Sequence, residues 1–197
     1  MNKEMLDLKQ KLNVILDYIE DKSDVVYLDY PIHHNVGDLL IYEGALQFLR
    51  DNGVKIKKSR SFRDFDVSEI KKIITKKTTI LCHGGGNFGD IYFPHQNLRE
   101  QAVKEFKNNR IIILPQTAHF SSDENLTRSA RIFSKHSDIV IFSRDTQSVG
   151  IFSKFSKRVI LMPDMAHHLY GNIKKARNKN NNSLYFLRKD CEINIQQ

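Results

Sequence analysis

The chain has 197 residues, the length of one ordinary domain, with 40% hydrophobic and 27% charged residues. This composition is typical of globular proteins and excludes wholesale disorder. Its 31 Lys and Arg residues against 23 Asp and Glu residues give a net charge of +8, which favours anionic partners such as phosphates. Because Trp is absent and the basic residues are scattered, we expect no nucleic-acid partner.

The longest apolar stretches fall far short of the roughly 20 residues that a membrane span requires. Residues 1–10 mix charged and apolar side chains, unlike a signal peptide. The two cysteines, Cys82 and Cys191, lie too far apart for a metal or redox motif. We therefore expect a reduced, cytoplasmic protein without a cofactor. The sequence leaves open whether the protein associates with the inner face of the membrane and whether it forms oligomers.

Apolar residues recur at helical spacing from Met5 to Ile19 and predict an amphipathic opening helix. After it, short apolar runs alternate with helical patterns. The expected strands span residues 25–28, 54–58, 78–82, 110–114, 139–142 and 159–162, and the expected helices span residues 39–50, 67–74, 96–107, 123–135 and 146–155. Alternating strands and helices with near-continuous apolar strands predict an α/β fold, a Rossmann-like parallel sheet with helices on both faces.

The strand and helix series ends near residue 170, which gives a first domain over residues 1–170. Residues 171–182 are basic and rich in Asn, without an acidic residue, and predict a linker. A further apolar run starts at Ser183 and predicts the beginning of a second domain over residues 183–197. We expect this second domain to be truncated.

Polar residues follow several of the expected strands, where parallel α/β sheets bind their ligands. The first such loop contains Asn35 and Asp38 and leads into a helix. Asp38 either caps that helix or hydrogen-bonds a ligand hydroxyl, and the sequence leaves both readings open.

The second loop runs from His83 to Asp90 and contains three consecutive glycines. The glycines fit the spacing GxGxxG, but Pro94 interrupts the helix that a dinucleotide site requires. We therefore interpret the segment as a ligand loop of another kind. Its glycines permit close approach of a substrate, and Asn87 and Asp90 offer contacts to hydroxyls.

Two more loops complete the set. Gln116 and Thr117 offer hydroxyl contacts, and His119 offers a proton carrier or a phosphate donor. Arg144 follows the strand 139–142, where a guanidinium clamps a carboxylate or phosphate through two hydrogen bonds. An ion pair of Arg144 with Asp145, or with a more distant acidic residue, is the competing interpretation. Because the loops end consecutive strands, we expect them to converge on one rim.

Five segments carry a family resemblance: residues 34–38, the glycine loop through Asp90, residues 114–117, Ser143 with Arg144, and residues 163–167. In order and placement they resemble the successive blocks of bacterial polysaccharide pyruvyl transferases, particularly the exopolysaccharide biosynthesis branch. The resemblance covers nearly the whole chain. It identifies the chain as similar to the N-terminal half of such an enzyme.

The resemblance implies two Rossmann-like halves, as in GT-B glycosyltransferases. It also implies phosphoenolpyruvate as the donor, and a sugar on a lipid-linked or growing polysaccharide as the acceptor on which a ketal is formed. Residues 187–190 resemble the opening of the second half. We expect the rest of that half to be absent, and this expectation leaves the activity of the chain alone open.

The residues expected at the site fall into three groups, and none is a metal ligand. We expect donor binding by Gly84, Gly85, Gly86, Asn87, Gln116, Thr117 and Arg144, acceptor binding by Asn35, Asp38 and Asp90, and catalysis by His119, Asp38 and Asp90. The resemblance places Arg144 and His119 at the anionic groups of the donor.

Two other functions remain compatible with the sequence because a fold does not fix a reaction. One is a nucleotide-sugar glycosyltransferase of the same GT-B type. The other is a non-catalytic half-domain that only binds a ligand or associates with a partner.

Overall fold

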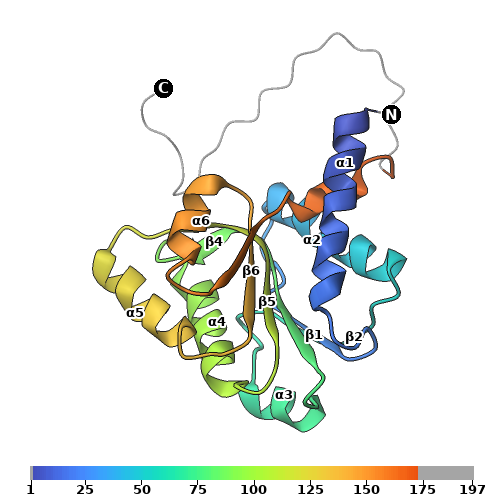
Figure 1. Ribbon diagram of the computed structural model, residues 1–197. Coiled ribbons are helices and arrows are strands. Elements are labelled where there is room, and N and C mark those ends of the chain that lie inside the picture. The colour runs from blue at the N-terminus through green and yellow to red at the C-terminus, as the bar shows by residue number, and fades with distance from the viewer. Residues whose placement is uncertain (1, 173–197) are drawn as a thin grey trace.

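The computed structural model describes residues 2–172. These residues form a sheet of seven strands, paired in parallel, with helices on both faces (Figure 1). The expected Rossmann-like α/β fold is confirmed. Residues 173–197, which contain most of the expected linker and all of the expected second domain, lie outside the described residues.

The strands are β1 (Val25–Leu28), β2 (Ile56–Arg60), β3 (Thr79–Cys82), β4 (Gly85–Gly89), β5 (Ile111–His119), β6 (Ile139–Ser143) and β7 (Arg158–Leu161). Their order is β2-β1-β3-β5-β6-β7, and β4 pairs with the far half of β5. The chain moves outward from β1 to β2 and then returns past β1 to β3. In such sheets the crevice at this reversal, beyond the carboxyl ends of the strands, is where ligands bind.

The helices are α1 (Lys3–Lys11), α2 (Val36–Asp51), α3 (Val67–Ile73), α4 (Phe93–Glu105), α5 (Asp123–Phe133) and α6 (Thr146–Phe152), with 3₁₀ segments η1 (Leu12–Tyr18) and η2 (Met165–Leu169). The single opening helix expected from Met5 to Ile19 is therefore divided into α1 and η1. Among residues 2–172, no helix has the length and hydrophobicity needed to cross a bilayer.

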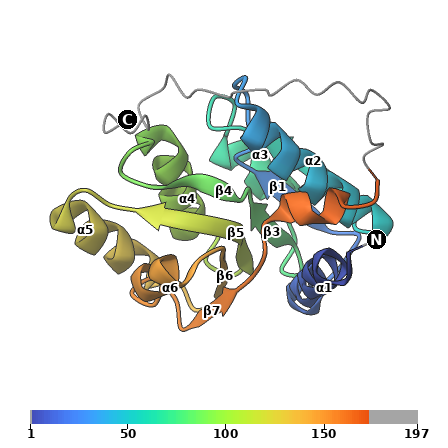
Figure 2. The same ribbon diagram turned by 90° about the horizontal axis from the view of Figure 1, so that it is seen from above.

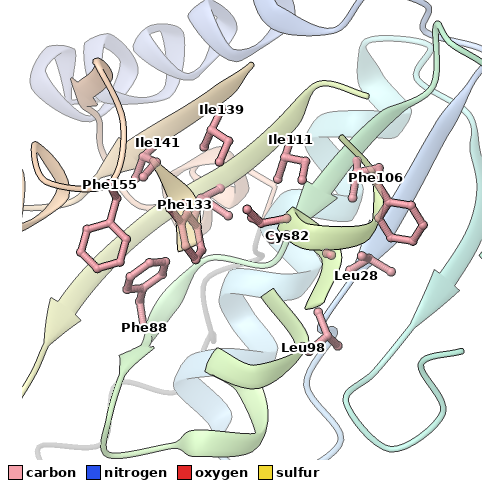
Figure 3. Packing of buried hydrophobic residues seen from close by; sticks show 14 of the residues in the cluster. Leu28, Cys82, Phe88, Leu98, Phe106, Ile111, Phe133, Ile139, Ile141 and Phe155 are labelled. Carbon is pink, nitrogen blue, oxygen red and sulfur yellow. The ribbon is translucent and has the colours of Figure 1, made fainter. Parts of the chain in front are cut away.

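Alternate residues of each strand point to opposite faces of the sheet and build two cores. One core lies between the sheet and helices α3 to α6, and Figure 3 shows Phe88, Phe133 and Phe155 meeting within it. The other core lies between the sheet and η1, α2 and η2. The neighbours Ile111 and Ile112 belong to different cores. The helices that follow β1 and β4 thus lie on opposite faces of the sheet.

The short segment η2 packs tightly on α2, and Figure 2 shows the orange segment lying along that helix. Gly44 permits this approach, since a Cβ atom there would lie 2.3 Å from the carbonyl oxygen of Met165. The contact fixes the position of Asp164, whose side chain caps η2 by accepting from the amide of Ala166 at 2.8 Å.

The segment after β3 differs from the expected loop. Residues 85–89 form β4, which pairs with the part of β5 that runs through Pro115 to His119. A Cβ atom on Gly84 would lie 2.5 Å from the Pro115 carbonyl oxygen, and one on Gly89 would lie 1.6 Å from the His119 carbonyl oxygen. Close backbone contact with β5, and not loop flexibility, therefore explains why glycine occupies these two positions.

Helix α4 begins earlier than expected. The sequence predicts a helix at residues 96–107 that begins only after Pro94. In the structure the helix starts at Phe93, with Pro94 in its first turn. Proline fits that position because its missing N–H would have no partner within the helix. Only a short turn thus separates the glycine strand from α4.

Gly89→Ala should lower the free energy of unfolding by more than about 2 kcal/mol. The residue has φ +131°, and its new methyl group would overlap the His119 carbonyl oxygen. Gly150→Ala is the matched control, because Gly150 is exposed within α6 and has nothing within 4 Å of its Cβ position. That change should stabilise the fold by up to about 1 kcal/mol. Denaturant unfolding measures both, and equal effects would contradict the close contact between β4 and β5.

Candidate functional site

Three neighbouring strands bring expected site residues to one edge of the sheet. Gly85 in β4 lies opposite Gln116 in β5, and Gln116 lies opposite Ser143 in β6. The amide of Arg144 donates to the carbonyl oxygen of Gln116 at 3.0 Å. The glycine segment, Gln116 and Arg144 therefore share an edge, as their places after consecutive strands predict.

Two successive glycines of β4 each face a charged side chain. A Cβ atom on Gly85 would lie 3.3 Å from Asp38 Oδ1, and one on Gly86 would lie 3.5 Å from Arg144 Nη2. Gly85 also has φ +117°, a conformation that favours glycine. A carboxylate therefore lies beside Gly85 and a guanidinium beside the next residue, Gly86.

The guanidinium of Arg144 is held by two side chains. Its Nη1 donates to Asp164 Oδ2 at 2.6 Å, and its Nε and Nη2 lie 3.3 and 3.1 Å from Thr117 Oγ1. Thr117 in turn donates to Asp145 Oδ2 at 2.9 Å. The ion partner of Arg144 is therefore Asp164 and not the neighbouring Asp145. With 26% of its side chain exposed, Arg144 is both oriented in advance and accessible to an anion.

The structure separates the roles of Asn35 and Asp38. Asn35 is the N-cap of α2, and its side chain accepts from the amide of Gly37 at 3.0 Å. Asp38 lies in the first turn of the helix, where its carboxylate faces Gly85 and lies 3.6 Å from His33 Nε2. Capping by Asn35 leaves the Asp38 carboxylate directed at the edge of the sheet.

Asp90 and His119 lie at the far end of the β4 and β5 pair, where Gly89 is opposite His119. The Asp90 carboxylate accepts from the amides of Ser121 and Ser122, the Ser121 hydroxyl and Asn125 Nδ2. Burial raises the pKa of Asp90, but these hydrogen bonds outweigh it and hold the pKa below its usual value. His119 is exposed, and its carbonyl oxygen accepts from the Asp90 amide.

A buried polar network lies behind the glycine strand. Arg99 from α4 is fully buried and donates to Asp29 Oδ2 at 2.6 Å and to the Asn87 carbonyl oxygen at 3.0 Å. Asp29, immediately after β1, also pairs with His95 Nδ1 at 2.6 Å. Asp29 has φ +67°, an uncommon conformation for a residue other than glycine. The network ties the end of β1 and the middle of β4 to helix α4.

His83, between β3 and β4, is a second buried group. Its Nδ1 lies 2.7 Å from the hydroxyl of Tyr27, while its Nε2 has no hydrogen-bond partner among residues 2–172. Burial, followed by the positive charge of Arg99, lowers the pKa of His83 to about 3. The imidazole is therefore neutral at physiological pH.

The sequence pattern does not predict four residues of this region: Tyr27, Asp29, Arg99 and Asp164. Arg99 falls inside an expected helix, where a charged side chain is usually exposed. For Asp164 the available signal is its place in the segment 163–167, which contributes to the family resemblance. Within residues 2–172, no group of three or more His, Cys, Asp or Glu side chains is arranged to hold a metal ion.

The fold and this edge define a Rossmann-like protein with charged side chains at its strand ends. The model of the polysaccharide pyruvyl transferase family matches residues 35–195 of the chain. The chain belongs to this family of transferases.

Individual relatives are similar over much of the chain. "Putative pyruvyl transferase EpsO" of Bacillus subtilis (strain 168) is 38% identical over 192 residues, which cover 96% of this chain and 58% of EpsO. "Pyruvyl transferase 1" of Schizosaccharomyces pombe is 31% identical over 157 residues, which cover 75% of this chain and 39% of that protein. The chain thus spans about half the length of these relatives.

His83→Asn should reduce the acid sensitivity of the fold. The unfolded chain binds a proton at His83 below about pH 6.5, whereas the folded chain resists that proton down to about pH 3. His83 therefore contributes stability above pH 6.5 that is lost as the pH falls, by about 1.4 kcal/mol per pH unit. Unfolding free energies measured across this range should fall less steeply for the variant. His34→Asn, at an exposed position, is the control, and an equal change in the two variants would contradict the assignment.

Proposed function

We propose that this chain forms one wall of a polysaccharide pyruvyl transferase site that uses phosphoenolpyruvate as its donor. The observation that carries the proposal is the guanidinium of Arg144, which Asp164 and Thr117 hold beside Gly86. A fixed and accessible guanidinium suits a donor that carries a phosphate and a carboxylate. The names of the relatives, which are pyruvyl transferases, support the transferred group.

The proposed reaction converts an enol phosphate and two sugar hydroxyls into a cyclic ketal and inorganic phosphate. A proton adds to the methylene carbon of the donor, and a first hydroxyl attacks the adjacent carbon while it loses its proton. The bond between that carbon and the phosphate oxygen then breaks. A second hydroxyl attacks the same carbon and loses its proton, which closes the ring. Of the two protons that the hydroxyls release, one balances the proton taken up by the methyl group and the other leaves with phosphate or solvent.

The residues of the edge suit separate parts of this reaction. Arg144 and the backbone amides of the glycine segment bind the donor anion and stabilise the charge that develops on the leaving phosphate. His119, exposed at the end of β5, is the group we propose as the acid. Asp38, which faces Gly85, orients or deprotonates a hydroxyl. Asp90 has four hydrogen bonds to residues 121–125, and we give it the role of fixing that turn.

We further propose that a second Rossmann-like half supplies the opposite wall, in a GT-B arrangement. The matched relatives are long enough to contain such a half, since the alignment covers 58% of EpsO.

The direct test is to measure phosphate release from phosphoenolpyruvate in the presence of polysaccharide acceptors. Thermal shift with phosphoenolpyruvate and with nucleotide sugars distinguishes the proposal from a glycosyltransferase. Stabilisation by nucleotide sugars alone would overturn it.

Arg144→Ala should weaken binding of phosphoenolpyruvate, or of inorganic phosphate, by roughly tenfold or more. Loss of a charge-assisted hydrogen bond in a partly enclosed site costs about 1.5 to 3 kcal/mol. Arg131→Ala removes the same charge from the exposed face of α5 and should have a much smaller effect. Calorimetry on the folded variants at physiological salt measures both. Equal weakening would show that binding follows the net charge of +8 and does not depend on Arg144.

A further inference from the structure

The side chain of Gln116 is fully buried, yet one of its two polar atoms has no partner. Its Nε2 donates to Asn87 Oδ1 at 2.8 Å, whereas its Oε1 accepts no hydrogen bond from residues 2–172. A buried acceptor without a donor is unfavourable, and native proteins keep few of them. Such an atom beside a candidate site points to a ligand that supplies the donor.

A buried arginine fixes the direction in which this oxygen points. Arg99 Nη2 donates to Asn87 Oδ1 at 2.5 Å. A guanidinium has no acceptor, so the Asn87 atom that faces it must be the oxygen. Gln116 contacts the same Asn87 atom and must present its NH₂ group to it. The Gln116 Oε1 atom is therefore held on the opposite side of its amide group.

That oxygen is directed toward the glycine strand. A Cβ atom on Gly85 would lie 3.8 Å from Gln116 Oε1 and 3.3 Å from Asp38 Oδ1. Ile41 Cδ1 lies 3.8 Å from the same point. Two oxygen acceptors and one methyl group thus lie around Gly85, which has no side chain of its own.

The chemistry of this position differs from that beside Gly86. An amide oxygen and a carboxylate accept hydrogen bonds and disfavour an anion, so the group bound there must be a donor. Arg144, which is next to Gly86, has the opposite preference. Hydroxyl groups satisfy the first position, and an aliphatic contact such as Ile41 suits the carbon atoms that bear them.

We propose that Gln116 and Asp38 form a hydroxyl-binding subsite for the acceptor sugar, with Asn87 and Arg99 as positioning residues behind it. The identity of the ligand as a sugar rests on the proposed function. The subsite moves Gln116 from the donor side, where the sequence analysis places it, to the acceptor side. Because consecutive Cα atoms are about 3.8 Å apart, the hydroxyl and the donor anion would bind at neighbouring glycines.

The test measures binding of two kinds of ligand to the wild-type chain and two variants. Methyl glycosides of glucose, galactose and mannose probe the hydroxyl subsite, and phosphoenolpyruvate probes the anion side, each by NMR titration. Gln116→Met keeps the size of the side chain and removes its acceptor. Gln47→Met is the matched control, since Gln47 is a half-buried residue of α2 whose amide pairs with Asp51.

Gln116→Met should weaken binding of the preferred glycoside about three- to tenfold, as expected for loss of one neutral hydrogen bond. Its affinity for phosphoenolpyruvate should stay within about twofold of wild type, and Gln47→Met should change neither affinity. Failure of every glycoside to bind the wild-type chain, or unchanged glycoside affinity in Gln116→Met, would overturn the subsite. Absence of phosphoenolpyruvate binding together with a glycoside effect would instead remove the proposed function and leave the subsite standing.

The positioning role is tested by two variants of Asn87 in the same titration. Asn87→Asp keeps an oxygen that accepts from both Arg99 and Gln116, whereas Asn87→Leu removes it and allows the Gln116 amide to rotate. We expect Asn87→Asp to bind the glycoside more tightly than Asn87→Leu. If Asn87 had only a structural role, the substitutions would lower thermal stability without a difference in glycoside affinity between the two variants. Equal glycoside affinity in two folded variants would therefore contradict the positioning role.

Discussion

The ligand-facing edge of the sheet depends on one buried guanidinium. Arg99 reaches from α4 to the carboxylate of Asp29 after β1 and to the backbone and side chain of Asn87 in β4. Transfer of a charge from water to the interior is costly, and it is tolerated here because the guanidinium meets an opposite charge and several acceptors. Loss of either charge would leave the other buried and unpaired. The end of β1 and the middle of β4 are thus tied to the same side chain of α4.

The same network also orients a side chain that Arg99 does not contact directly. Through Asn87 it orients Gln116, and the glycines of β4 allow the two sides of the edge to approach within a few ångströms of the backbone. The segment η2 packs on α2 and places Asp164 against Arg144. A carboxylate thus lies beside Gly85 and a guanidinium beside Gly86, two neighbouring positions that have no side chains. This arrangement suits the reaction that we propose.

Much of the architecture follows from local patterns in the sequence. Apolar runs such as Ile111 to Leu114 bury both faces of a strand, and polar loops after successive strands must meet at one edge of a parallel sheet. The sequence therefore predicts the fold class, the edge and the neighbourhood of Gly85, Gln116 and Arg144. It also predicts a loop where β4 forms, because consecutive glycines have no strand propensity of their own.

The sequence by itself thus determined the strand and helix series, since hydrophobic periodicity is a property of neighbouring residues. Only the tertiary structure decided which polar side chains act on one another. Pairing of β4 with β5 depends on backbone contacts at Gly84 and Gly89, and the partner of Arg144 is Asp164, twenty residues further along the chain. Burial of Arg99 depends on the carboxylate of Asp29, which lies outside α4. Such contacts join distant segments, and their energies arise only once the chain is packed.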